Sequence, residues 1–190
     1  MKTRAWTLAL LLTSATACAG ITETGPLMSA EKEARALVGV KYVPGIQGEK
    51  FTSRLSCTSD GSARLSIAGV PYPEWSFGTA LCQGRHVETL EQRVSEENGV
   101  TTWRIVDALL LPPVAADWDP HRQNKLQISL MGECTLDERT DTSFFALVRW
   151  RDRERVDWKT GVEHAWTYDI EKGRIVPVST KRVVCEWLEP

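Results

Sequence analysis

Hydrophobic and polar residues alternate along most of the chain after residue 50, which is the pattern of half-buried β-strands. The alternation runs through residues 51–57 and resumes at 63–67. Residues 59–61, Ser-Asp-Gly, favour a turn between them, so the two segments are expected to form a hairpin. Residues 71–74, two of which are proline, then interrupt the pattern.

A strong hairpin signal lies further along, where Asn98-Gly99 separates two long runs. Both residue types tolerate the left-handed backbone of a two-residue turn. A turn placed there sets Val94 opposite Trp103 and gathers apolar residues on one side, as a half-buried antiparallel pair requires. A helix over 87–94 is the competing interpretation, and the turn favours strands.

Short strand-like segments continue to the end of the chain, joined by turns rich in Gly, Asp and Asn. This succession predicts a mainly β fold, an antiparallel sandwich or barrel with two disulfides. The N-terminal part differs, because Ser29 can cap a short helix over 29–38. The later strand segments are 126–134, 144–150, 165–170, 174–178 and 181–187.

Five cysteines change the picture of where this fold forms. Four of them, Cys57, Cys82, Cys134 and Cys185, make an even set that is typical of two disulfides in an oxidising compartment. Pairing Cys57 with Cys82 and Cys134 with Cys185 closes each loop within one half of the chain, and we favour it over the other two pairings. Four free buried thiols are the alternative, and zinc is disfavoured because no two cysteines have C-x-x-C spacing.

The N-terminus has the three regions of a signal peptide. Lys2 and Arg4 precede an apolar run over 5–12, and small residues fill 13–17 just before Cys18. The apolar run is much shorter than the roughly 20 residues that a membrane-spanning helix needs. We therefore expect this segment to be cleaved rather than to act as an anchor.

The residues around the expected cleavage site, Ala15-Thr16-Ala17-Cys18, resemble a bacterial lipobox. The resemblance implies a diacylated Cys18, and Ala19 in place of aspartate implies sorting to the outer membrane, facing the periplasm. Ala15 and Ala17 also satisfy the A-x-A rule of the ordinary signal peptidase, which would give a soluble periplasmic or secreted protein.

Three parts follow from these signals. Residues 1–17 are the expected signal peptide, 18–28 a lipidated cysteine and flexible tether, and 29–190 a single β-rich domain. Cleavage of the signal peptide would leave 21 basic and 25 acidic residues, which gives a net charge near −4. No global basic field remains, so we expect no nucleic-acid partner. We expect the lipid to insert into the membrane, and the domain to bind a protein of the envelope.

Catalytic chemistry has little support. The chain has three histidines, none in a G-x-S-x-G context, so a serine or cysteine triad is not indicated. Asp117, Asp119 and His121 alternate within one loop and could begin a metal site, but a polar loop ended by Pro120 explains them more simply. No pair of carboxylates stands out for glycoside chemistry. The sequence indicates no cofactor.

Two groups of residues are candidates for partner binding. Arg149, Arg151, Arg153 and Arg155 would project from one face if their segment stays extended, and could hold phosphate or carboxylate groups. A charged hairpin end with internal pairing is the simpler interpretation. Of seven tryptophans after the signal peptide, most are expected in the core, and Trp118 and Trp158 have the polar surroundings of exposed contacts.

The leading hypothesis is therefore a non-catalytic, lipid-anchored protein of the bacterial cell envelope that binds another macromolecule. The partner would be a component of an envelope assembly, or a toxin or lytic enzyme that this protein inhibits. The first alternative is a periplasmic hydrolase acting on cell-wall or glycan material through carboxylates or a metal. The second is a carrier of a small ligand or lipid.

Overall fold

A computed structural model describes residues 28–45, 48–67, 69–114, 125–129, 133–139, 143–151 and 153–186. Five predicted site residues therefore lie outside the described part. They are Cys18 and four residues of one loop, Asp117, Trp118, Asp119 and His121.

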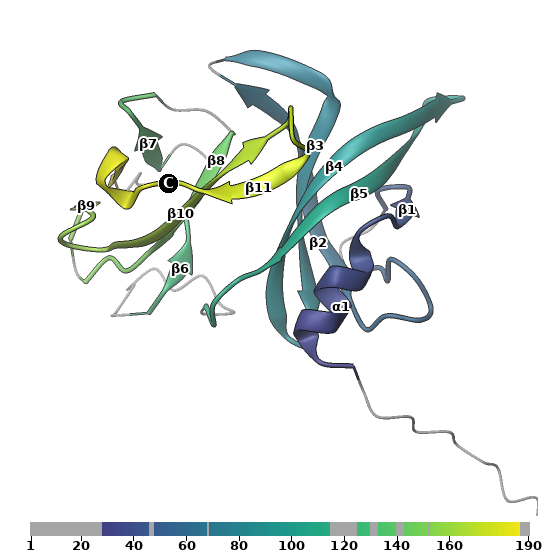
Figure 1. Cartoon of the computed structure of the whole chain (residues 1–190), viewed down its shortest axis with the longest axis horizontal. Coiled ribbons are helices and arrows are strands. Elements are labelled where there is room, and N and C mark those ends of the chain that lie inside the picture. The colour runs from purple at the N-terminus through teal and green to yellow at the C-terminus, as the bar shows by residue number, and fades with distance from the viewer. Residues whose placement is uncertain are drawn as a thin grey trace, which may run out of the picture.

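The N-terminal half forms one helix and a five-stranded antiparallel sheet whose strand order is β1-β5-β4-β3-β2. Figure 1 shows the helix lying across one face of this large sheet. The elements are α1 (Ala30–Leu37), β1 (Lys41–Tyr42), β2 (Thr58–Ile67), β3 (Val70–Cys82), β4 (Arg85–Glu97) and β5 (Val100–Leu110).

The C-terminal half forms two smaller antiparallel sheets, one of order β11-β10-β8-β6 and one of order β7-β12-β9. The fold is thus mainly β, with open sheets in a sandwich-like arrangement (Figure 1). The strands are β6 (Gln127–Ile128), β7 (Cys134–Leu136), β8 (Phe144–Val148), β9 (Arg155–Asp157), β10 (Val162–Asp169), β11 (Arg174–Pro177) and β12 (Val183–Glu186), with a 3-10 turn η1 (Thr180–Arg182) before β12.

Both faces of the large sheet are covered near its middle. On one face, Ala34 and Leu37 of α1 pack with Val87 and Ile105 of the sheet. On the other face, Leu90 and other apolar residues of the large sheet pack with residues of β8 and β10. Because both faces are covered, five consecutive residues of β4, Val87 to Glu91, are buried. A strand covered on one face only would bury every second residue.

The predicted N-terminal helix is confirmed. The Ser29 hydroxyl accepts a hydrogen bond from the Lys32 amide at 3.4 Å, which caps the first turn. Glu31 and Glu33 place negative charge near the same end. Among the described residues no helix is both long and apolar enough to span a bilayer.

The Asn98-Gly99 turn is also confirmed, since both residues have positive φ, 52° and 77°, and Glu97 pairs with Val100. The predicted register fails a few residues further on. A bulge sets Arg93, not Val94, opposite Trp103, and the Val94 side chain is 43% exposed. The bulge depends on the neighbouring strands, so the turn alone could not predict it.

The expected hairpin over 51–67 is wrong. Residues 59–61 lie inside β2 at a bulge, and β2 pairs with β3 instead. Residues 71–74 do not end the strand: β3 continues through them, with a second bulge between the Arg64–Ser76 and Leu65–Tyr72 pairs. Pro71 and Pro73 come before Trp75, the first β3 residue that pairs with β4. The two prolines therefore remove no hydrogen bond between β3 and β4.

Both predicted disulfides are present. Cys57 is bonded to Cys82 and Cys134 to Cys185, and the second pair joins directly opposed residues of β7 and β12. By the loop-entropy model each bridge contributes about 3 to 4 kcal/mol to stability.

Candidate functional site

The predicted row of four arginines does not form. The chain turns after Trp150, because the Arg153 amide donates to the Trp150 carbonyl and Arg151 has a φ of 51°. The buried Trp150 side chain holds the segment against the core, which keeps it from running extended. Arg149 and Arg155, at the two ends of the segment, form ion pairs with glutamates of neighbouring strands instead.

Arg149 pairs with Glu163 of β10 at 2.6 Å, and Arg155 of β9 pairs with Glu186 of β12. The simpler interpretation, a charged turn with paired arginines, agrees better with the structure. The partners are glutamates of β10 and β12, however, and not acidic residues within the turn itself.

Trp158 is exposed, as predicted. It lies in the turn after β9 with 44% of its surface accessible. The ammonium groups of Lys159 and Lys181 lie 5.2 and 5.3 Å from its ring centroid, within cation–π range. Trp103 and Trp150, in contrast, are buried. The turn therefore exposes an aromatic ring flanked by two cations.

Two buried carboxyl groups on β4 were not anticipated. Glu88 lies between the large sheet and β10, where its Oε1 accepts a hydrogen bond from the Tyr168 hydroxyl at 2.5 Å. Burial raises the pKa of Glu88 to about 8; the Tyr168 hydroxyl lowers this pKa and the nearby Glu91 raises it. Glu88 is therefore mainly protonated at pH 7, which is how a carboxyl group can occupy a core.

Glu91 faces the opposite side of the same strand. Its Oε1 accepts hydrogen bonds from the hydroxyls of Tyr42 and Thr89, at 2.6 and 2.8 Å, whereas its buried Oε2 has no hydrogen-bond partner among the described residues. Burial raises the pKa of Glu91, and hydrogen bonds from Tyr42, Thr89 and Ser76 lower it. Gly78 makes room for this carboxyl, since a Cβ there would lie 2.6 Å from Oε1.

A hollow of about 380 Å³ opens on the sheet face beside this carboxyl, and we call it the Glu91 pocket. Ser76 lies between the pocket and Glu91. Its side chain lines the pocket, and a hydrogen bond from its hydroxyl lowers the pKa of Glu91. The volume is within the range of ligand-binding pockets. The lining residues are Val43 and Pro44 after β1, Ser62, Ala63 and Arg64 of β2, Ser76 of β3, and Gly99, Val100, Thr101 and Trp103 at the tip and start of β5.

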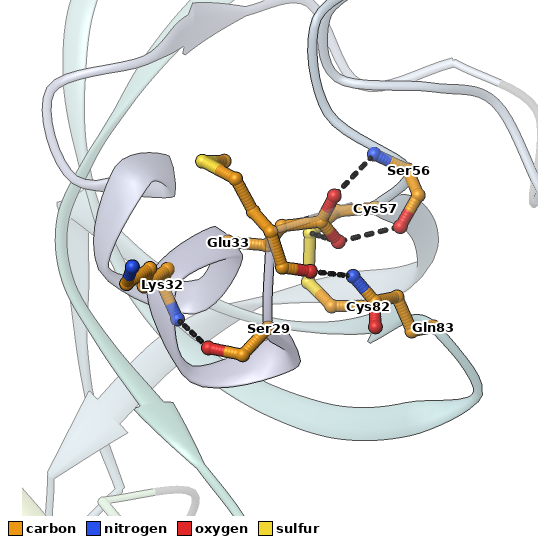
Figure 2. Close-up of a disulfide and its surroundings, with 8 residues drawn as sticks. Ser29, Lys32, Glu33, Ser56, Cys57, Cys82 and Gln83 are labelled. Carbon is orange, nitrogen blue, oxygen red and sulfur yellow. Dashed lines mark hydrogen bonds between the residues drawn. A yellow bond between two sulfur atoms is a disulfide. The ribbon is translucent and has the colours of Figure 1, made fainter. Parts of the chain in front are cut away.

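A third buried acid, Glu33 of α1, lies beside the Cys57–Cys82 disulfide (Figure 2). Its carboxylate accepts hydrogen bonds from the Ser56 amide at 3.2 Å and the Ser56 hydroxyl at 2.5 Å. Both sulfurs are held in the disulfide, so this group is not a metal site. These hydrogen bonds hold α1 against the loop that contains Ser56 and Cys57.

No pattern in the sequence indicates that Glu88 and Glu91 are buried, because acidic residues in a strand are normally assigned to its exposed face. Only the packing on both faces of β4 reveals them. No family model, curated protein or solved structure matches this chain.

Proposed function

We propose that this chain is an exported, lipid-anchored protein of the bacterial cell envelope, and that its β domain binds a protein partner there. The observation that carries the proposal is the use of all four cysteines after Cys18 in two disulfides. Such bridges are typical of proteins that fold outside the reducing cytoplasm. Cys18 is the remaining cysteine, and its lipobox-like context supplies an anchor.

Binding to a protein is favoured by the kind of surface that the domain offers. Trp158 beside Lys159 and Lys181 combines an exposed aromatic ring with cations that have no ion-pair partner among the described residues. Aromatic and basic side chains of this kind contribute strongly to protein interfaces. The net charge of −2 over the whole chain supports no nucleic-acid partner.

Cross-linking in intact cells tests the proposal. We expect the tagged chain to give a discrete covalent complex with one envelope protein, and Trp158→Ala to weaken that complex. Trp75→Phe, at a partly buried position in the core, is the matched control and should leave it unchanged. Recovery of no protein partner, together with turnover of cell-wall material by the pure domain, would contradict the proposal and support the hydrolase alternative.

A further inference from the structure

The Glu91 pocket has an apolar side and a polar side. Val43 and Val100 form its rim and are 49% and 50% exposed, while Trp103 beneath them is buried. Ser62 and Ser76 supply hydroxyl groups on the other side. A ligand that fits must therefore bring an apolar group and a few hydrogen-bonding atoms.

Arg64 supplies the charge at this pocket. Its side chain is exposed on β2 and has no ion-pair partner among the residues that the structure describes. Arg93 of β4 differs, because it is paired with both Glu74 and Glu96. An unpaired guanidinium at a pocket rim is suited to a carboxylate, which it can bind with two parallel hydrogen bonds.

The carboxyl of Glu91 beside the pocket is buried and does not line it. Burial raises the pKa of Glu91, which shifts this group towards its neutral form and so weakens its repulsion of an anion. Its hydrogen bonds with Tyr42 and Thr89 hold it in place.

The strand beside the pocket favours a peptide as the ligand. β2 is the outer strand of the large sheet, so the outward backbone of Gly61 to Arg64 has no partner strand within the described part of the chain. An extended segment can form backbone hydrogen bonds to such an edge while its side chains enter a neighbouring pocket.

The position of the pocket agrees with a tethered protein. Gln83, in the turn between β3 and β4, donates a hydrogen bond to the Met28 carbonyl, so the chain enters the domain at that end of β4. Gly99 and Val100 line the pocket at the opposite end, beside the free hairpin tip (Figure 1). The 13 residues of β4 span about 40 Å, so the pocket points away from the N-terminal tether.

We propose that the Glu91 pocket binds an extended segment of the protein partner in which an apolar side chain is followed by a carboxylate. The apolar side chain covers Val43 and Val100, and the carboxylate pairs with Arg64. The inference rests on the proposed function and names the recognition chemistry of its partner.

Synthetic peptides test this inference on the purified full chain. Three rhodamine-labelled hexapeptides are compared by fluorescence anisotropy: alternating Val-Glu, the neutral Val-Gln and the basic Val-Lys. We expect the acidic peptide to bind about tenfold more tightly than the neutral one, the difference that one charged hydrogen-bonded pair supplies. The basic peptide should bind least.

Matched variants locate the binding. Arg64→Glu should remove the preference for the acidic peptide, and Val43→Asp should weaken all binding. Arg174→Glu on β11 repeats the charge reversal at an exposed site away from the pocket, and Val70→Asp repeats the rim change at another exposed valine. Both controls should bind as the wild type does.

Equal binding of acidic and neutral peptides, absence of peptide binding, or wild-type binding by Arg64→Glu would each overturn the inference. Cross-linking of Arg64→Glu in cells separates this failure from that of the proposed function. If the envelope partner is still captured in wild-type amount, the partner exists but does not use the Glu91 pocket. If the wild type captures no partner, the proposed function itself fails.

Discussion

Individual carboxyl groups on β4 set the chemistry of this domain. Glu88 and Glu91 lie three positions apart, so the alternation of side chains along a strand places them on opposite faces of the sheet. Each accepts a hydrogen bond from a tyrosine hydroxyl of a different element, β10 or β1. Glu88 therefore connects the large sheet to β10 of the sheet packed on it, whereas Glu91 connects β4 to β1 within the large sheet.

The raised pKa of Glu88 predicts a pH dependence of stability. In the unfolded chain this group titrates near 4.5, whereas in the folded chain it titrates at about 8. The folded state holds the extra proton between these values, so the stabilisation is complete below about pH 4.5 and is lost as pH rises to about 8. Urea midpoints measured from pH 5 to 8 should fall across this window.

Glu88→Gln tests the assignment, because an amide keeps the shape of the neutral acid and cannot ionise. The variant should show a clearly smaller loss of stability between pH 5 and 8 than the wild type. Glu97→Gln, at an exposed position on the same strand, is the control and should retain the wild-type slope. An unchanged slope in Glu88→Gln would mean that Glu88 does not titrate in this range.

Gly78 is predicted to be required by the Glu91 carboxyl. A methyl group at Gly78 would lie 2.6 Å from Glu91 Oε1 and 3.0 Å from both the Gly61 carbonyl and the Thr89 hydroxyl. Gly78→Ala should therefore lower the free energy of unfolding by about 1 to 3 kcal/mol. In a Glu91→Ala background the same change should cost less, as a double-mutant cycle by urea unfolding would show. Equal costs in both backgrounds would contradict this contact.

At the scale of elements, each disulfide joins two segments that lie far apart in the sequence. β7, β12 and β9 have only three or four residues each, too few for a stable isolated sheet. The Cys134–Cys185 bridge joins two of these strands across a sequence separation of 51 residues. The Cys57–Cys82 bridge, with a separation of 25, holds the loop against which α1 packs.

Removal of either disulfide should destabilise the domain. Replacing both cysteines of one bridge with serine is expected to lower the free energy of unfolding by about 3 to 4 kcal/mol, with the larger loss for Cys134 and Cys185 because their loop is longer. Denaturant unfolding of the two double variants and the wild type measures this. Wild-type stability in either variant would contradict a supporting role for that bridge.

The elements that the sequence predicted are those fixed by local or covalent signals. Ser29 caps α1, Asn98-Gly99 forms its turn, and all four cysteines pair as expected. The bulges in β2, β3 and β4 could not be predicted, because they depend on how neighbouring strands align. For the candidate sites, the exposure of Trp158 followed from its polar neighbours. The arginine row failed because the burial of Trp150 bends the chain.

On the scale of the whole molecule, the layers leave one region of the large sheet open. α1 and the disulfide-bonded loop cover one face of the sheet at the end where Met28 enters, and the C-terminal sheets pack on the other face. The hairpin tip extends beyond these layers (Figure 1), and the Glu91 pocket lies beside it. A chain anchored through its N-terminus would thus present this pocket to a partner.

The intact mass of the chain recovered from the envelope of a bacterial host tests the export claim most directly. We predict a species that begins at Cys18, carries the added mass of a lipid, and lacks four hydrogens because its other four cysteines form two disulfides. A cytosolic product with an uncleaved N-terminus and all cysteines reduced would contradict the account.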